Sequence, residues 1–405
     1  MILITDTDSL ARFCSSLAGA DFVTVDTEFM RERTYWPKLC LVQLAGPQEA
    51  AVVDALADGL DLQPLLDFLN ESPALKVFHA ARQDIEIFHH LTGRIPQPVF
   101  DTQIAAMVCG FGESVGYETL VSKLAKARID KSMRFTDWSH RPLSDKQLQY
   151  ALSDVTHLRV AYEKLAQRLE RTGRADWLEE EIRTMTTPAT YVVEPEDAWK
   201  RIKLRGGKPL FLAILKELAA WRERMAQERD VPRSRVMRDD MLLDIAARAP
   251  RSEPELARTR SVGRSGLPQQ VARDVIEAVN RACALPENDR PVMVQREELP
   301  RGMGPLVDML RLLLKMVCDK EDVAQKLVAS GADLEMIAAD DNADVPALHG
   351  WRRQLFGENA LRLKHGKLAL AANGHAIMLL RLDGDTASAE PAESTGESHR
   401  ITVNP

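Results

Sequence analysis

The 405-residue sequence lacks the features that mark membrane, secreted and fibrous proteins. No uncharged apolar run approaches the roughly 18 residues that a membrane span requires, so we expect no membrane partner. Residues 1–8 lack the basic and then apolar pattern of a signal peptide, and we therefore expect a cytoplasmic location. Hydrophobic residues make up 45% of the chain and charged residues 28%, a composition that excludes collagen-like and wholly disordered proteins.

Cysteine is scarce and scattered. The five residues are Cys14, Cys40, Cys109, Cys283 and Cys318, and none of them forms a C-x-x-C pair. An odd number without such pairs predicts neither a disulfide framework nor a zinc site. We expect five buried thiols.

The net charge of −7 argues, taken alone, against a nucleic-acid partner, but the charge is unevenly distributed. Residues 200–264 hold 17 Lys and Arg against 9 Asp and Glu, a net charge of +8 that leaves −15 on the other 340 residues. This asymmetry indicates a basic module on an acidic chain, where phosphate contacts are expected. A solvated helix face would carry the same charges.

Short β-rich runs characterise the first part of the chain. Residues 21–29 and 39–45 predict a hairpin, and 51–54 predicts a third strand. Residues 75–79 predict a strand that leads directly into a helix containing Asp84. Strands that first meander and then alternate with helices predict an α/β domain with a mixed sheet.

From Leu210 onward the sequence shows no convincing strand pattern, and apolar residues recur every three or four positions, which predicts helices. Residues 242–247 resemble residues 334–339, 92 positions later, so we expect two all-helical modules. In chain order, the expected organisation is an α/β domain at 1–190, a basic linker at 191–207, a helical module at 208–288, a linker at 289–304, a second helical module at 305–383 and a disordered tail at 384–405.

Asp26 and Glu28 are two positions apart on a predicted strand, so both side chains point to the same face of the sheet. The strand looks central, because Val23, Val25 and Phe29 are apolar. Two ionised carboxylates beside a core repel each other unless a cation neutralises them, and carboxylate oxygens suit Mg²⁺ or Mn²⁺. The pair is therefore a candidate metal site, and a solvent-exposed strand face is the alternative.

Three further residues carry information mainly as a set. Asp84 follows a strand near the start of a helix, where an acid also stabilises the helix dipole. Tyr150 and Asp154 are four apart and share one face of a predicted helix. The ordered combination of D-x-E, then D, then Y-x-x-x-D on these element types is much more specific than any of its parts.

These motifs identify a resemblance. Residues 1–170 resemble the DEDD superfamily of 3′→5′ exonucleases, in the subgroup with Tyr in the third motif, and within it the ribonuclease D family. The three motifs are residues 25–28, 78–84 and 150–154, and further matches are residues 29–37, 96–103, 130–132, 136–138 and 141–143. The region after residue 208 resembles the HRDC module, shared with RecQ-type helicases, followed by a degenerate second copy.

The resemblance implies a ribonuclease H-like exonuclease domain in which four acids hold two divalent ions, Mg²⁺ or Mn²⁺. By resemblance, Asp26 bridges both ions, and Glu28 and Asp154 complete the site that activates water. Asp84 acts at the other ion through water. Tyr150 has an unperturbed pKa near 10, which makes it a poor base at neutral pH, so we assign its hydroxyl to orienting the water.

Other residues are candidates for substrate binding. His79 could contact the substrate backbone, or it could be a satisfied core residue. Near the first motif, cations alternate with an aromatic ring, as phosphate pairing and base stacking require, although a solvated hairpin has the same composition; these residues are Arg31, Arg33, Tyr35 and Lys38. The linker offers a basic patch, or only a flexible connector; its cations are Lys200, Arg201, Lys203, Arg205 and Lys208.

The sequence thus predicts an exoribonuclease that trims tRNA precursors and other small structured RNAs from their 3′ ends and releases 5′-monophosphates. The single-stranded tail would enter the active site, and the helical modules would grip the folded body. A DNA-directed or general 3′→5′ exonuclease has the same chemistry, and a non-catalytic RNA-binding protein is the alternative from another class. We expect a monomer, because one active site needs no partner subunit.

Overall fold

The computed structural model describes residues 2–204, 206–263, 266–293, 300, 302–382 and 388–390. The chain divides into two compact units. The first unit comprises residues 1–99, 130–159 and 184–296, and the second comprises residues 100–129, 160–183 and 297–405.

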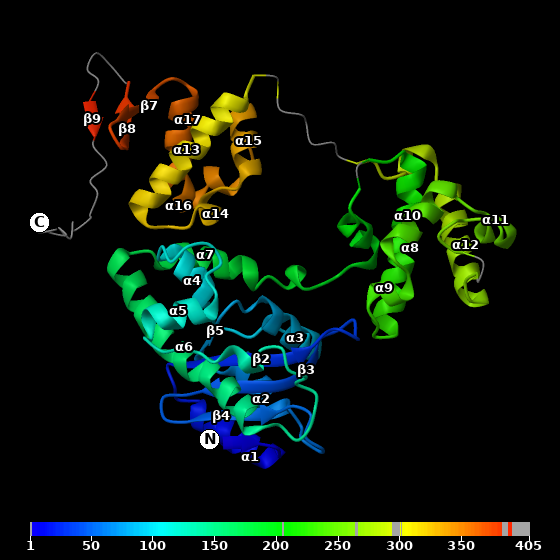
Figure 1. Ribbon diagram of the computed structural model, residues 1–405, viewed down its shortest axis with the longest axis horizontal. Coiled ribbons are helices and arrows are strands. Elements are labelled where there is room, and N and C mark those ends of the chain that lie inside the picture. Colours follow the sequence, from blue (N-terminus) through cyan, green and yellow to red (C-terminus); the bar gives the residue numbers. More distant parts are fainter. Residues whose placement is uncertain are drawn as a thin grey trace, which may run out of the picture. The chain divides into compact units, whose positions relative to one another are not determined.

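Six strands form one sheet with the order β1-β4-β3-β2-β5-β6. Figure 1 labels β2, β3, β4 and β5 of this sheet. They are β1 (Ile2–Ile4), β2 (Phe22–Met30), β3 (Lys38–Ala45), β4 (Ala50–Asp54), β5 (Leu75–Phe78) and β6 (Val99–Asp101). β3 pairs antiparallel with β2 and β4, whereas β1 pairs parallel with β4 and β5 pairs parallel with β2. The predicted hairpin and mixed sheet are confirmed, and β1 is a strand that the sequence pattern did not reveal.

Helices cover both faces of the sheet. These are α1 (Thr7–Leu17), α2 (Gln63–Glu71) and α3 (Arg82–Thr92) on one face and α6 (Asp145–Thr172) on the other. The alternation of the strands explains this arrangement, since Val42 and Val53 pack in the core with α1, α2 and α3, while Leu41 and Val52 pack against α6. The face toward α6 is the face of Asp26 and Glu28.

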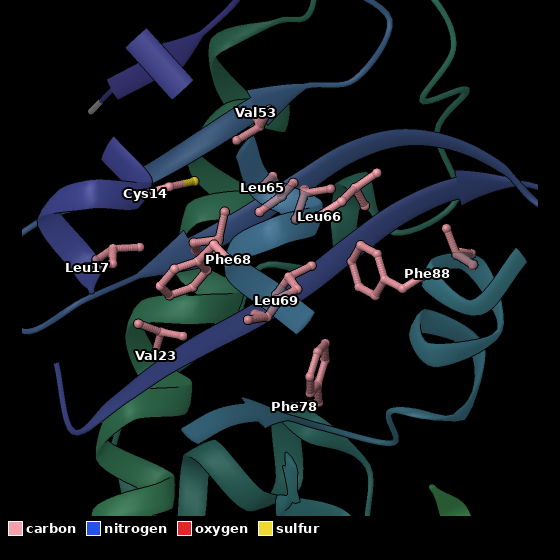
Figure 2. Packing of buried hydrophobic residues seen from close by; sticks show 14 of the residues in the cluster. Cys14, Leu17, Val23, Val53, Leu65, Leu66, Phe68, Leu69, Phe78 and Phe88 are labelled. Carbon is pink, nitrogen blue, oxygen red and sulfur yellow. The ribbon is translucent and has the colours of Figure 1, made fainter. Parts of the chain in front are cut away.

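The core on the first face is built mostly from aliphatic and aromatic side chains. Leu65 and Leu69 of α2, Val23 of β2, and Phe78 and Phe88 all belong to this core, and Figure 2 shows them together. The helix α3 begins two residues after Ala80, which has a left-handed φ of 59°. This turn between β5 and α3 sets where the first turn of α3, and with it Asp84, is placed.

The first helical module has its own core. Its helices are α8 (Pro209–Glu228), α9 (Arg233–Val236), α10 (Asp239–Arg248), α11 (Glu253–Ala257) and α12 (Gln269–Ala284). Ala198 and Ile202, from the predicted linker, are buried in this core. The linker is therefore packed on the module over these residues instead of being a free connector.

The second unit is mostly helical. Its helices are α4 (Thr102–Val108), α5 (Tyr117–Leu124), α7 (Ala175–Met185, which ends in the first unit), α13 (Gly304–Glu321), α14 (Gln325–Val328), α15 (Gly331–Ala339), α16 (Gly350–Arg352) and α17 (Glu358–Lys364). Arg352 is 5% exposed and pairs with Glu180 and Glu181, while Trp351 stacks on Trp177 with centroids 4.2 Å apart. These contacts join α16 to α7.

Short helical turns complete the two units. They are the 3₁₀ turns η1 (Lys131–Met133), η2 (Pro188–Thr190), η3 (Pro195–Arg201), η4 (Glu287–Asp289) and η5 (Pro346–Leu348), and the π-helical turn η6 (Arg353–Gly357).

The helix order α8-α9-α10 recurs as α13-α14-α15. α9 and α14 end 92 residues apart, at Val236 and Val328. Asp230 and Asp322, also 92 residues apart, both have a left-handed backbone, with φ of 47° and 52°. The recurrence of an uncommon conformation at the same spacing supports the predicted duplication.

Some expectations need correction. The second module is not all-helical, because β7 (Leu368–Asn373) and β8 (Ala376–Arg381) pair antiparallel and β9 (Ser388–Glu390) pairs with β8. Short apolar runs on either side of Gly374 favour a pair of strands joined by a turn. The predicted disordered tail at 384–405 lies outside the described residues, except for residues 388–390, which form β9. Four cysteines are buried free thiols, but Cys283 is only half-buried.

Candidate active site

The strand β2 places two acids on one face of the sheet, and α6 supplies a third. Asp26 and Glu28 lie on β2, opposite Gln43 and Leu41 of β3. Asp154 lies on α6, which covers this face. Oxygen atoms of Asp26, Glu28 and Asp154 all lie within 4.8 Å of one another. The structure therefore brings together three of the four acids predicted from the sequence.

Burial and mutual repulsion make the carboxyl groups hold their protons more tightly than usual. Burial raises the pKa of Asp26 to about 7. Burial, followed by the charges of Asp26, Asp154 and Asp84, raises the pKa of Glu28 to about 10. Burial and the charge of Asp26 raise the pKa of Asp154 to about 8. A group of carboxylates in this state is favourable only with protons or a cation.

Asp84 lies in the first turn of α3 and is buried. Its carboxylate accepts a hydrogen bond from the hydroxyl of Thr27, which points to the other side of β2 from Asp26 and Glu28. Asp84 is outside the close group of three acids, but its charge acts on Glu28. This placement suits a residue that acts at greater distance from the central carboxylates.

Tyr150 and Asp154 stack on one face of α6, as their spacing predicts. The Tyr150 hydroxyl donates a hydrogen bond to Asp154, and burial is the largest cause that raises the pKa of Tyr150 above its usual value of 10. The phenol is therefore neutral at physiological pH. It can donate a hydrogen bond but cannot act as a base.

The loop before α6 supports Tyr150 from the side. The ring of Trp138 lies 6.0 Å from the ring of Tyr150. Arg141 binds both carboxylate oxygens of Asp54, at 2.6 and 2.7 Å, and also the carbonyl oxygen of Cys40. In the sequence, residues 136–138 and 141–143 matched the family, but the match assigned them no role. Only the tertiary contacts show that they hold the start of α6 against β3 and β4.

The donor set fits a divalent cation. The close group offers carboxylate oxygens alone, the ligands preferred by Mg²⁺ and Mn²⁺, and no thiolate or imidazole belongs to it. A cation would offset the repulsion that raises the three pKa values.

The four predicted substrate-binding residues of the hairpin differ in exposure and in their partners. Arg33 and Lys38 are exposed, and Arg31 pairs with Glu86 of α3 through two hydrogen bonds of 2.7 Å. Tyr35 is different, because it is only 6% exposed and its hydroxyl donates to Glu223 of α8. In this structure its ring contacts the first helical module and offers no open face to a base.

The remaining candidates are His79 and the cations of the linker. His79 is half-buried at the end of β5, in the turn that leads to α3. Lys203 is exposed beside the first helical module, and Lys200 pairs with Asp197 at 2.7 Å. Arg205 lies outside the described residues.

The chain matches two family models and, over nearly its whole length, several ribonuclease D proteins. Residues 1–170 match the 3′-5′ exonuclease family, and residues 211–279 match the HRDC domain. The chain is 52% identical to ribonuclease D of Nitrobacter hamburgensis, over 92% of this chain and 97% of that protein. It is 49% identical to ribonuclease D of Acidiphilium cryptum, over 94% of this chain and 97% of that protein.

A solved structure agrees with these matches. The crystal structure of Escherichia coli RNase D, described as an exoribonuclease involved in structured RNA processing, superposes with a TM-score of 0.76. It is 32% identical, and the alignment covers 90% of this chain and 98% of that one. None of the helices within the described ranges combines the length and apolar character needed to cross a bilayer. With its mixed sheet, acidic group and HRDC domain, the chain belongs to the ribonuclease D family and is a 3′→5′ exoribonuclease.

Proposed function

We propose that this exoribonuclease trims the 3′ trailers of tRNA precursors and other small structured RNAs, one nucleotide at a time, and releases 5′-monophosphates. The observation that carries the proposal is the close group of Asp26, Glu28 and Asp154 beside Tyr150, in a chain that also carries an HRDC domain. The description of the Escherichia coli relative as acting in structured RNA processing supports this substrate class.

Asp26, Glu28 and Asp154 would hold the divalent cations, Mg²⁺ or Mn²⁺, and Asp84 would assist from the first turn of α3 through water. When bound, two such ions would lower the pKa of water and offset charge on the phosphodiester oxygens. The chain itself orients these parts. The sheet carries Asp26 and Glu28 on a rigid strand, and α6 places Asp154 opposite them.

Tyr150 orients the attacking water. Its neutral hydroxyl donates to Asp154 and lies beside the acids. A hydroxyl in this position can donate a hydrogen bond to the attacking water and so fix its orientation. Attack on the terminal phosphodiester leaves the phosphate on the released nucleotide and a free 3′-hydroxyl on the shortened RNA. That new end has the same form as the old one, so the cycle can repeat.

The RNA is held at two places. Arg33 and Lys38 are exposed on the hairpin that continues from β2, close in sequence to Glu28, and they suit the phosphates of the single-stranded tail. Lys203 and the basic residues of 200–264 suit the folded body. Tyr35 is left out of this set because of its burial. A monomer suffices, since one chain supplies all the acids.

The test is degradation of a 5′-labelled tRNA precursor with a 3′ trailer, in Mg²⁺, in Mn²⁺ and in EDTA. Asp154→Asn and a DNA strand of the trailer sequence are run beside it. We expect stepwise shortening of the RNA alone, abolished by EDTA and by the substitution.

Two results would contradict the proposal. Equal trimming of the DNA strand would assign a general exonuclease, because the same acids serve both sugars. Binding of the precursor without trimming in either metal would assign RNA binding without catalysis to the chain.

A further inference from the structure

Gln43 lies directly opposite Asp26 in the sheet. The antiparallel register of β2 and β3 pairs Asp26 with Gln43, and the register of β3 and β4 pairs Gln43 with Val52. Side chains directly opposite each other on neighbouring strands share a face, with Cβ atoms about 5 Å apart. The Gln43 amide is therefore within reach of the Asp26 carboxylate.

The side chain of Gln43 is fully buried. Its exposure is 0%, and within the described residues neither its amide nitrogen nor its amide oxygen has a hydrogen-bond partner. On the same face Leu41 and Val52 pack with Ala151 of α6. Of its two partners in register, only Asp26 is polar.

A buried amide without a partner costs free energy, so such groups in folded proteins call for an explanation. An apolar residue would pack here at lower cost, because Leu41 and Val52 on this face and Ala151 of α6 are apolar. The amide does have a use when Asp26 is an ionised ligand, since a carboxylate accepts hydrogen bonds only and its orientation has to be held.

We propose that Gln43 is a positioning residue for Asp26. Its amide N–H donates to the Asp26 carboxylate, directly or through one buried water, when that carboxylate binds a cation. The hydrogen bond holds the carboxylate in the orientation that binds the metal. This inference rests on the proposed metal-dependent function and adds a residue that acts through Asp26.

The test compares Gln43→Met, which keeps the length and removes the donor, with wild type. Gln43→Leu is a second variant in case methionine packs poorly. Leu41→Met is the matched control, because Leu41 lies on the same strand and face, two residues away. Mn²⁺ affinity is measured by electron paramagnetic resonance, and the melting temperature is measured without metal.

We expect Gln43→Met to bind Mn²⁺ about 10- to 100-fold more weakly, the usual effect of removing a group that orients a ligand. We also expect its metal-free melting temperature to equal or exceed that of wild type, since an unpaired amide has been removed. Leu41→Met should leave Mn²⁺ affinity unchanged. Activity of Gln43→Met should recover in part at high Mn²⁺.

A Mn²⁺ affinity of a folded Gln43 variant within twofold of wild type would overturn the proposal. The same assay with Asp154→Asn separates this from the proposed function. If Asp154→Asn keeps full activity and Mn²⁺ affinity, the proposed metal site is wrong. If Asp154→Asn loses both and the Gln43 variants lose neither, only the role of Gln43 is wrong.

Discussion

The hydroxyl of Tyr35 donates a hydrogen bond to the buried carboxylate of Glu223, 188 residues later in the chain. Arg233 binds both oxygens of the same carboxylate, and it also donates to the Tyr35 hydroxyl at 2.9 Å. Asp230 accepts the backbone N–H of Tyr35 at 3.0 Å. The HRDC domain thus holds the hairpin that continues from β2, the strand of Asp26 and Glu28.

This relationship predicts that Glu223 stabilises the first unit more than Tyr35 does. Glu223→Gln removes a buried charge that pairs with Arg233, and we expect a loss of about 2 kcal/mol in the free energy of unfolding. Tyr35→Phe removes one hydrogen bond and leaves the ion pair, so we expect a loss of about 1 kcal/mol. Urea denaturation measures both.

Limited proteolysis provides a second measurement. Trypsin should cut Glu223→Gln at Arg31 or Arg33 faster than wild type, because the hairpin is released from α8. Glu217→Gln is the control, since Glu217 is also on α8 but contacts Arg281. Equal cutting rates in all three proteins would show that the contact does not hold the hairpin.

Asp154→Asn is expected to lower kcat by about 1000-fold, because loss of a metal ligand removes several kcal/mol of stabilisation from the transition state. Glu163→Gln, an exposed position on the same helix, should retain full activity. Single-turnover trimming of a labelled RNA gives both rates. A less than tenfold loss in Asp154→Asn would remove this residue from the metal site.

Tyr150→Phe should keep cation binding and lose turnover. The variant retains the ring that packs near Trp138 but loses the donor to Asp154, so we expect kcat to fall by about 10- to 100-fold while KM changes little. Titration with Mn²⁺ checks the metal affinity. A large loss of that affinity would instead make Tyr150 part of the structure of the site.

The metal-free protein should lose stability as the pH rises from 6.5 to 8. The folded-state pKa values of Asp26 and Asp154, about 7 and about 8, lie above those of the unfolded chain, so the folded state binds more protons in this range. Stability that depends on those protons is lost as they dissociate. Melting curves without metal measure the fall.

Mg²⁺ should reverse this trend, raising the melting temperature more at pH 8 than at pH 6.5, because it replaces protons. Asp154→Asn is the control and should show a shallower dependence on pH. The same slope in wild type and variant would show that other groups cause the change.

The exposed cations predict a salt dependence of binding. Replacing Arg33 and Lys38 by alanine should weaken binding of a single-stranded 3′ tail and reduce the slope of log affinity against log salt by roughly 0.7 for each phosphate that the variant no longer binds. Lys203→Ala should affect a precursor with a folded body more than a short tail. Fluorescence anisotropy in a salt series with Ca²⁺ in place of the active metal separates these effects. An unchanged slope for a variant would show that the replaced residue does not bind a phosphate.

Local geometry explains why much of the site could be predicted. The period of two in a strand places Asp26 and Glu28 on one face, and the four-residue spacing in a helix stacks Tyr150 and Asp154. Neither statement needs to know what lies elsewhere in the chain. Short β-rich runs likewise predicted β2 to β5, whereas the edge strand β1 has only three residues, too few to stand out as such a run.

Contacts between residues far apart in the chain decided whether each candidate cation or aromatic residue is exposed or buried. The hairpin composition fits RNA binding, but Tyr35 is buried, and its hydroxyl donates to Glu223 of the HRDC domain. The basic linker looks flexible in composition, but Ala198 and Ile202 fill the core of the HRDC domain. A short stretch of sequence contains no information about partners that are far away in the chain.

The sequence by itself determined the four acids, the tyrosine, the α/β and helical order of the chain and the family to which these belong. Only the tertiary structure decided that Asp26, Glu28 and Asp154 form a close group, that Asp84 bonds to Thr27, and that Gln43 faces Asp26. The physical reason is that side-chain direction follows from local backbone geometry, whereas strand register and helix packing depend on hydrophobic contacts between residues far apart in the chain.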